Sequence, residues 1–232
     1  MVAPGCRPLS GAKMDESTRN LVIASIVLVL AAMYGGDTLG SWFVWDRDVD
    51  FNDGTDTTTK TKFYLEGLEY EYRYSDPDNV DGGSERDKGN VDYGDNDCTG
   101  LGLGGNDCEE LEDLMMGKIQ NLLYIIIVAG FATLYFMTQG ANEEMAANAC
   151  LVMGGAALLA AAMFALSFPE ALDDDMGTYE LIDDDPSLFG DDKETDDSDG
   201  YEYDRSWRPD IAWVLVLLSG IVGMAAYTEL KR

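Results

Sequence analysis

The chain has 232 residues and a net charge of −29, because 44 Asp and Glu residues outnumber 15 Lys and Arg residues. Such a surface repels nucleic acid and anionic lipid headgroups, so the composition excludes a protein that binds nucleic acid. The chain also has no His, the residue that most often serves as a general base or a transition-metal ligand. We therefore expect no enzymatic activity, no cofactor and no dedicated metal site.

The negative charge is concentrated in two segments, and four other segments are almost wholly apolar. A helix that crosses a bilayer needs about 20 apolar residues. Residues 20–36, 119–139, 145–168 and 211–227 meet this requirement without a charged side chain. The sequence therefore predicts a membrane protein, a bundle of four transmembrane helices that has the lipid bilayer as its first partner.

The first span admits a second interpretation, a cleaved signal peptide. Residues 20–36 lack a clean cleavage site before the charged loop and exceed the usual apolar core of about 7–15 residues. We interpret this span as a retained helix. Met14 is an alternative start of translation, in which case residues 1–13 do not belong to the natural protein.

Four spans place both ends of the chain on the same side of the membrane. The tails, residues 1–19 and 228–232, are short and basic, and positively charged tails favour the cytoplasmic side. We therefore predict cytoplasmic tails and a cytoplasmic turn at 140–144. The acidic loops, residues 37–118 and 169–210, then lie outside, and the plasma membrane is the expected location.

The first outer loop alternates polar and apolar residues over segments 45–51 and 61–74, as β-strands with one covered face do. The alternation in the second segment changes parity at Gly67, where we expect a bulge or a tight turn. A weaker strand candidate, residues 201–207, lies in the second loop. The sequence predicts a small antiparallel sheet above the helices.

The predicted sheet has one aromatic face. One role for this face is functional, a surface that binds an extracellular protein partner. The other role is structural, in which the face is the sheet's own core or a belt at the membrane interface. We favour the structural role. The residues of this face are Trp45, Phe51, Tyr70, Tyr72, Tyr74, Tyr201, Tyr203 and Trp207.

The third and fourth spans contain small residues at the spacing of helix contacts. Small residues let helix backbones approach closely where lipid supplies no hydrophobic force between helices. We expect packing within the bundle, and the alternative is a dedicated dimer motif of a homo-oligomer. The residues concerned are Gly154, Gly155, Ser219, Gly220 and Gly223.

Residues 76–97 and 173–199 are rich in Asp, Gly and Ser, and we expect them to be mobile. Their aspartate runs do not match the calcium-loop pattern of carboxylates at alternate positions before a fixed glycine and a later Glu. We predict no tight metal site, only weak attraction of cations. The aspartates concerned are Asp173, Asp174, Asp175, Asp183, Asp184 and Asp185.

Cys98 and Cys108 lie in the first outer loop, separated by nine residues that include four glycines. Disulfides persist outside the cell, and closing a ring of this size stabilises the fold by about 2–3 kcal/mol in the chain-entropy account. We therefore predict a disulfide between these two residues. The glutamates after Cys108 predict a helix that runs into the second span, with Asn106 or Asp107 as its cap.

The order of these features resembles the claudin-like tetraspan superfamily, which has four spans, a larger first outer loop with strands and a shorter second loop. Trp42 or Trp45 matches the Trp that follows the first span in that family. Cys98 and Cys108 match its pair of cysteines.

The resemblance departs from the family pattern at three points. The family has Gly-Leu-Trp after the first Trp, whereas here Glu69 follows Gly67 and Leu68. Cys98 lies far downstream of this motif, and Cys108 leads almost directly into a helix. The resemblance implies an outer sheet, lateral association in the membrane and contact with neighbouring cells or envelope partners.

We derive three functional hypotheses. The first is a non-enzymatic membrane protein that associates through its outer sheet and its helix faces. The second, an alternative, is a protein that gathers or conducts cations with its acidic outer loops, as first-loop charge does in claudins. The third, a thiol-oxidising membrane enzyme, is disfavoured because the chain has no Cys-x-x-Cys pair.

Overall fold

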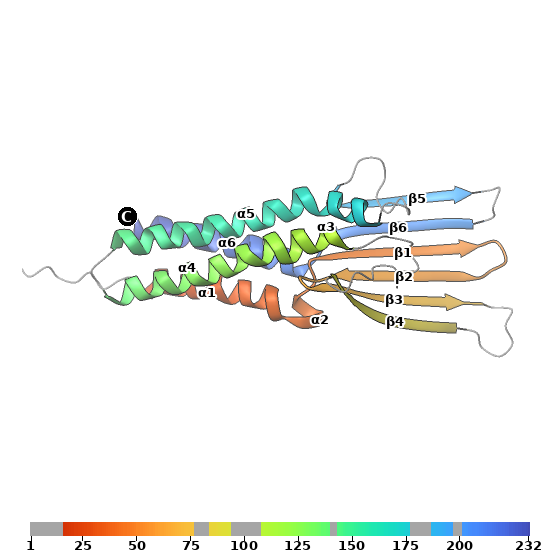
Figure 1. Cartoon of the computed structure of the whole chain (residues 1–232), viewed down its shortest axis with the longest axis horizontal. Coiled ribbons are helices and arrows are strands. Elements are labelled where there is room, and N and C mark those ends of the chain that lie inside the picture. The colour runs from red at the N-terminus through yellow and green to blue at the C-terminus, as the bar shows by residue number, and fades with distance from the viewer. Residues whose placement is uncertain (1–15, 77–83, 94–107, 140–142, 177–186, 197–200) are drawn as a thin grey trace, which may run out of the picture.

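The computed structural model describes residues 16–76, 84–93, 108–139, 143–176, 187–196 and 201–232. Long helices lie side by side in one half of the molecule, and a β-sheet forms the other half (Figure 1). The long helices are α1 (Glu16–Tyr34), α4 (Gln120–Gln139), α5 (Glu143–Met176) and α6 (Ile211–Leu230). A short helix, α2 (Gly36–Leu39), follows α1.

A continuous helical segment leads into α4. It consists of α3 (Glu109–Glu112) and a π-helical stretch, η3 (Asp113–Ile119). This arrangement confirms the predicted helix that runs from Cys108 into the second span. The segment rises beside the sheet, so that α3 lies next to the outer end of α5 (Figure 1).

Four helices are long and apolar enough to cross a membrane, namely 16–34, 109–139, 143–175 and 211–230. Their outward surface is apolar, and the exposed fractions of Val128 and Leu166 are 68% and 79%. Their inward surface is rich in alanine, glycine and serine. Apolar side chains that face outward around a bundle of small residues fit a lipid environment.

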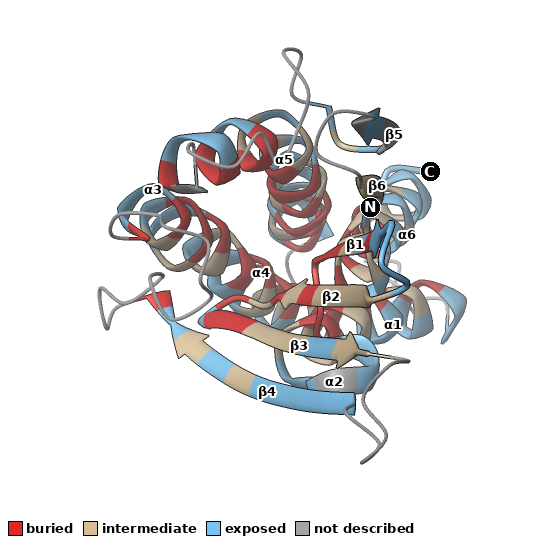
Figure 2. Cartoon of the chain, turned by 90° about the vertical axis from the view of Figure 1, so that its right-hand side faces the viewer, coloured by how far each residue is buried: buried red, intermediate tan, exposed pale blue. Residues whose placement is uncertain are grey.

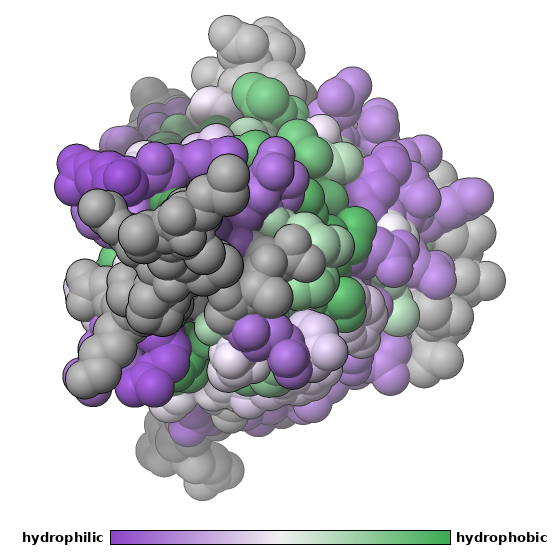
Figure 3. Space-filling view, turned by 90° about the vertical axis from the view of Figure 1, so that its left-hand side faces the viewer, coloured by the Kyte–Doolittle hydropathy of each residue, from purple (hydrophilic) through white to green (hydrophobic). Residues whose placement is uncertain are grey.

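Both ends of the helical part of the chain lie at the same end of the bundle. The carboxyl terminus and the first residues of α1 lie at the end opposite the sheet (Figure 1). Seen from that end, a band of hydrophobic residues lies between two groups of hydrophilic residues (Figure 3). The four predicted apolar helices are therefore confirmed. The start of α1 and the end of α6 lie at the same end of the bundle, opposite the sheet.

The sheet has six antiparallel strands in the order β4-β3-β2-β1-β6-β5. The first loop provides β1 (Phe43–Phe51), β2 (Asp56–Phe63), β3 (Gly67–Ser75) and β4 (Ser84–Asp92). The second loop provides β5 (Gly190–Asp196) and β6 (Tyr201–Pro209). The pairing of β1 with β6 joins the two loops into one sheet.

The predicted antiparallel sheet is confirmed, with more strands than the sequence indicates. Segments 45–51 and 201–207 lie in β1 and β6, and segment 61–74 forms the hairpin of β2 and β3. The change of parity at Gly67 marks a tight turn, in which the Tyr64 amide donates to the Gly67 carbonyl at 2.8 Å. Strands β4 and β5 lie within the two stretches that we expected to be mobile, and that expectation is wrong for these residues.

The sheet and the bundle share one hydrophobic core. Phe168, near the outer end of α5, contacts Phe43 of β1 and Phe63 of β2, with ring centroids 4.7 Å and 5.4 Å apart. Phe164, one turn earlier, stacks on Phe168 and contacts Trp42. Both Phe164 and Phe168 lie at the end of the predicted span, and α5 itself continues to Met176. The aromatic contacts pack the sheet firmly on the helices.

Candidate interaction surface

The pairing register divides the sheet into two faces, because directly opposite residues of antiparallel strands point to the same side. Trp45 lies opposite Trp207 on one side and Thr61 on the other, and Thr61 lies opposite Tyr70. Alternation along each strand then assigns all eight predicted aromatic positions to one face, which we call the aromatic face. Its members are Trp45, Phe51, Tyr70, Tyr72, Tyr74, Tyr201, Tyr203 and Trp207.

The aromatic face is covered near the helices and open farther out. Trp45 and Trp207 are buried, and the Trp207 indole donates to the Ser187 carbonyl at 3.0 Å. In contrast, the exposed fractions of Phe51 and Tyr72 are 40% and 36%. In Figure 2 the strands β1, β2 and β3 contain buried, red segments, whereas the edge strand β4 is pale blue and tan. The part near the bundle therefore belongs to the core, as we favoured, and the outer part is accessible.

Each edge strand places a glycine under an aromatic ring of its neighbour. Gly89 of β4 lies opposite Tyr70, and Gly190 of β5 lies opposite Trp207. A Cβ atom at either glycine would collide with the ring beside it. An aromatic side chain that covers a glycine in this way fixes the register of a neighbouring strand. The two edges are therefore held in place although their own side chains are mostly exposed.

Asp175 connects the outer ends of α5 and α3. Its carboxylate accepts hydrogen bonds from the backbone amides of Glu110 and Leu111, at 3.1 Å and 2.7 Å. Amides in the first turn of a helix have no partner within that helix, so Asp175 caps α3 from another element. The predicted caps, Asn106 and Asp107, lie outside the described residues.

Tyr93 is fully buried at the same junction, after β4. Its hydroxyl donates to the Tyr64 carbonyl at 3.1 Å, and burial raises the pKa of Tyr93 far above its ordinary value. Cys108 is also fully buried there, as the residue before α3. Cys98 lies outside the described residues, so the predicted disulfide stays a prediction.

Of the aspartates that we expected to attract cations, only Asp173, Asp174 and Asp175 lie in the described residues, and these three do not form one site. Asp173 and Asp174 are exposed, Asp175 is used as the cap, and residues 183–185 lie outside the described part of the chain. In the described residues, no group of three or more His, Cys, Asp and Glu side chains is arranged to hold a metal ion.

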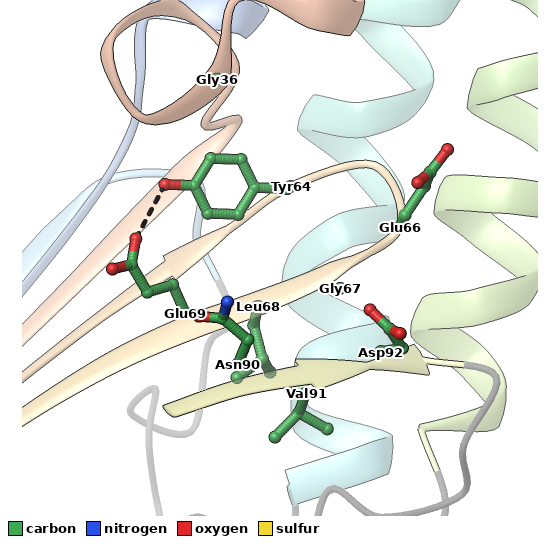
Figure 4. A pocket seen from close by; sticks show the side chains of 9 residues that line it. All are labelled: Gly36, Tyr64, Glu66, Gly67, Leu68, Glu69, Asn90, Val91 and Asp92. Carbon is green, nitrogen blue, oxygen red and sulfur yellow. Dashed lines mark hydrogen bonds between the residues drawn. The ribbon is translucent and has the colours of Figure 1, made fainter. Parts of the chain in front are cut away.

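A pocket of about 310 Å³ lies between α2 and the β3–β4 edge (Figure 4). The Tyr64 hydroxyl donates to Glu69 across it, at 3.3 Å. Glu66 and Asp92 also line the pocket, but Figure 4 shows these carboxylates at separate points of the rim and not directed at a common centre. The pocket thus offers no set of converging ligands.

The second face of the sheet is charged and crossed by ion pairs, and we call it the charged face. Glu71 at its middle contacts Arg73, Arg86 and Lys88, at 2.6, 2.7 and 3.1 Å. Arg86 and Arg73 lower the pKa of Glu71 to about 2. Lys60 of β2 pairs with Asp46 of β1 at 3.1 Å. The basic residues of this face come from three different strands, and only the pairing register brings them together.

The small residues of the bundle occupy different environments. Gly154 of α5 and Gly223 of α6 bring their backbones into contact, whereas Gly155 faces open space. Ser219 exchanges hydrogen bonds with Ser25 of α1, because each hydroxyl donates to the other residue's carbonyl, at 3.0 and 3.1 Å. Gly220 packs against Leu158 of α5.

No protein-family model matches the sequence, and no curated protein matches it. The functional inference therefore depends on the surfaces of the molecule. Two of them are accessible in the described residues, the outer part of the aromatic face and the charged face beyond its end near the helices, where Val44 is buried.

Proposed function

We propose that the chain is a non-enzymatic, multi-pass membrane protein that associates laterally, or with envelope or neighbour-cell partners, through its outer sheet. In this proposal the tails are cytoplasmic, the sheet lies outside the plasma membrane, and the protein is claudin-like in architecture. The single observation that carries the proposal is a broad sheet, built from both loops and fixed to four apolar helices by a common core.

The faces of the sheet, and not its edges, support association. The end strands, β4 and β5, each have one side on which no further described strand pairs, but both are rich in charged residues, which disfavour pairing with another strand. The faces are large, and the core shared with α5 holds them at a fixed angle to the bundle, which lowers the entropic cost of a specific contact.

Subunit counting tests the proposal. The full chain, labelled at its carboxyl end, is placed in lipid nanodiscs and in native membranes at low density, and photobleaching steps are counted. We expect dimers or larger species, and we expect Phe51→Ser or Arg73→Glu in the sheet to change their fraction. Leu166→Ala, on the lipid-facing side of α5, is the control. Single steps throughout, with no effect of any sheet variant, would refute the proposal.

One observation favours a second candidate, a protein that gathers cations. Asp48 lies directly opposite Asp204, and Asp50 directly opposite Glu202. Carboxylates paired in this way attract counter-ions from solution. A liposome flux assay separates this role from conduction, because surface accumulation alone gives no flux above that of empty liposomes.

A further inference from the structure

The charged face is divided into halves of opposite sign. On β2, β3 and β4 its five basic residues outnumber the four acidic ones, which are Asp56, Glu69, Glu71 and Asp92. On β1, β6 and β5 its acidic residues outnumber the basic ones, which are Lys193 and Arg208. The basic half contains Lys60, Lys62, Arg73, Arg86 and Lys88, and the acidic half contains Asp46, Asp48, Asp50, Asp191, Glu202 and Asp204.

This separation places like charges side by side within each half. Arg73 lies directly opposite Arg86 in the basic half, and Asp48 lies directly opposite Asp204 in the acidic half. Like charges in directly opposite positions destabilise a sheet. Glu71, which contacts both Arg73 and Arg86, offsets part of this repulsion in the basic half. Almost half of the 15 Lys and Arg residues of a chain with a net charge of −29 lie on this one face. A surface of the opposite sign placed over each half would offset the repulsion.

We propose that the charged face is the contact between two copies of this chain in the same membrane, related by a two-fold axis parallel to the helices. This inference rests on the proposed function. It specifies that the partner is a second copy of the chain and that the contact surface is the charged face. A rotation of 180° about that axis turns the two charged faces toward each other and reverses the strand order of the second copy. The basic half of each copy then covers the acidic half of the other.

The register allows the opposed residues to be worked out. The axis passes between β1 and β2, the middle strands, so β3 faces β6 and β4 faces β5 of the second copy. Arg73 and Asp204 share one level of the sheet, through Thr58 and Asp48, and therefore meet across the axis. The other pairs of opposite charge are Lys60 with Asp46, Lys88 with Asp191, and Glu69 with Arg208.

Two pairs in this arrangement have like charges, Arg86 with Lys193 at the edges and Asp50 with Asp56 at the tips of the strands. Packed sheets are twisted and diverge away from the centre of their contact, so these peripheral pairs lie farther apart than the central ones. The complementary pairs therefore dominate the contact.

The charge pattern also excludes the other face-to-face arrangement. A two-fold axis across the strands, as for copies in two facing membranes, preserves the strand order. It would place Arg73 against β3 and Asp204 against β6 of the second copy, with basic residues on basic and acidic on acidic. Like-charge juxtaposition costs several kcal/mol at an interface. The charged face therefore selects a partner in the same membrane.

Charge reversal tests the pairing. In nanodiscs or native membranes, we expect Arg73→Glu or Asp204→Arg alone to raise the dissociation constant of the dimer about tenfold or more, because each change affects two symmetric contacts. The double variant should restore the dimer, which a simple loss of folding would not allow. We also expect the unmodified dimer to weaken as salt rises, because these contacts are exposed.

Cross-linking tests the geometry with a matched pair of threonines. Thr58 of β2 lies on the charged face near the axis, and the adjacent Thr59 lies on the aromatic face. Facing sheets are about 10 Å apart, so an impermeant bismaleimide of that length should join two copies of Thr58→Cys but not of Thr59→Cys. Oligomers that form without Thr58→Cys cross-linking and without double-variant rescue would overturn this inference while leaving lateral association intact. Monomers under all conditions would overturn both.

Discussion

Substitution of Gly154 and Gly155 by alanine, one at a time, tests the packing of α5 on α6. A Cβ atom on Gly154 would lie 2.9 Å from the Met224 backbone nitrogen and 3.0 Å from the Gly223 carbonyl carbon. Backbone atoms cannot rotate away, so the two helices would have to separate. Overpacking of this kind costs about 1–3 kcal/mol.

The neighbouring substitution has the opposite expectation. A Cβ atom on Gly155 would have no heavy atom within 4 Å. Alanine is a better helix former than glycine by about 1 kcal/mol, so Gly155→Ala should leave the free energy of unfolding unchanged or raise it. Unfolding of the two variants in mixed micelles, followed by circular dichroism as the denaturing detergent increases, gives both values. Equal free energies of unfolding for Gly154→Ala and Gly155→Ala would refute the packing described here.

Three further predictions concern the sheet and its junction with the helices. Asp175→Ala leaves two amides of α3 without their acceptor and should lower the free energy of unfolding by about 1–3 kcal/mol, whereas the exposed Asp174→Ala should change it by less than about 0.5 kcal/mol in the same unfolding assay. Gly190→Ala should displace the buried Trp207 ring, seen as a red shift of tryptophan fluorescence, while Asp191→Ala on the other face should not. Because the pKa of Glu71 is lowered from 4.5 to about 2, its ion pairs stabilise the fold fully above pH 4.5 and are lost as the pH falls toward 2. Glu71→Gln should therefore be less stable than the unmodified chain at neutral pH, and a difference that persists unchanged below pH 2 would contradict this.

The sequence is sufficient to predict the four long helices and parts of the four strands that have a buried side, β1, β2, β3 and β6. Apolar length alone identifies the spans, and alternation identifies β1 because Val49 and Trp45 are covered while Asp48 is not. Strand β4 has no such signal, because most of its side chains are exposed on both faces. Its backbone is held by pairing with β3, and pairing between distant segments leaves no local pattern in the chain.

Contacts between helices and strands that are distant in the sequence also could not be predicted from the sequence. Asp175 and Leu111 are far apart in the sequence, so nothing near α3 indicates that its cap comes from the end of α5. Gly154 and Gly155 are equivalent as residues, and only the rotation of α5 against α6 makes one of them a contact and leaves the other exposed. The split of the charged face arises in the same way, because the strand order decides which charges become neighbours.

The way in which the sheet is attached determines what association in the membrane could do. Two links join it to the bundle, the Phe168 cluster beneath β1 and β2 and the hydrogen bond from the Ala212 amide of α6 to the Ser41 carbonyl just before β1, at 3.0 Å. A sheet on a single flexible stalk could rotate, and its charged face would then meet partners at any angle. A sheet fixed at both points moves only with the bundle, so helices confined to one bilayer hold two such sheets upright and parallel. That constraint allows the small energies of exposed ion pairs to add along the shared axis of the proposed dimer. It predicts that any change that loosens the Phe168 cluster will weaken the dimer, although Phe168 lies outside the charged face.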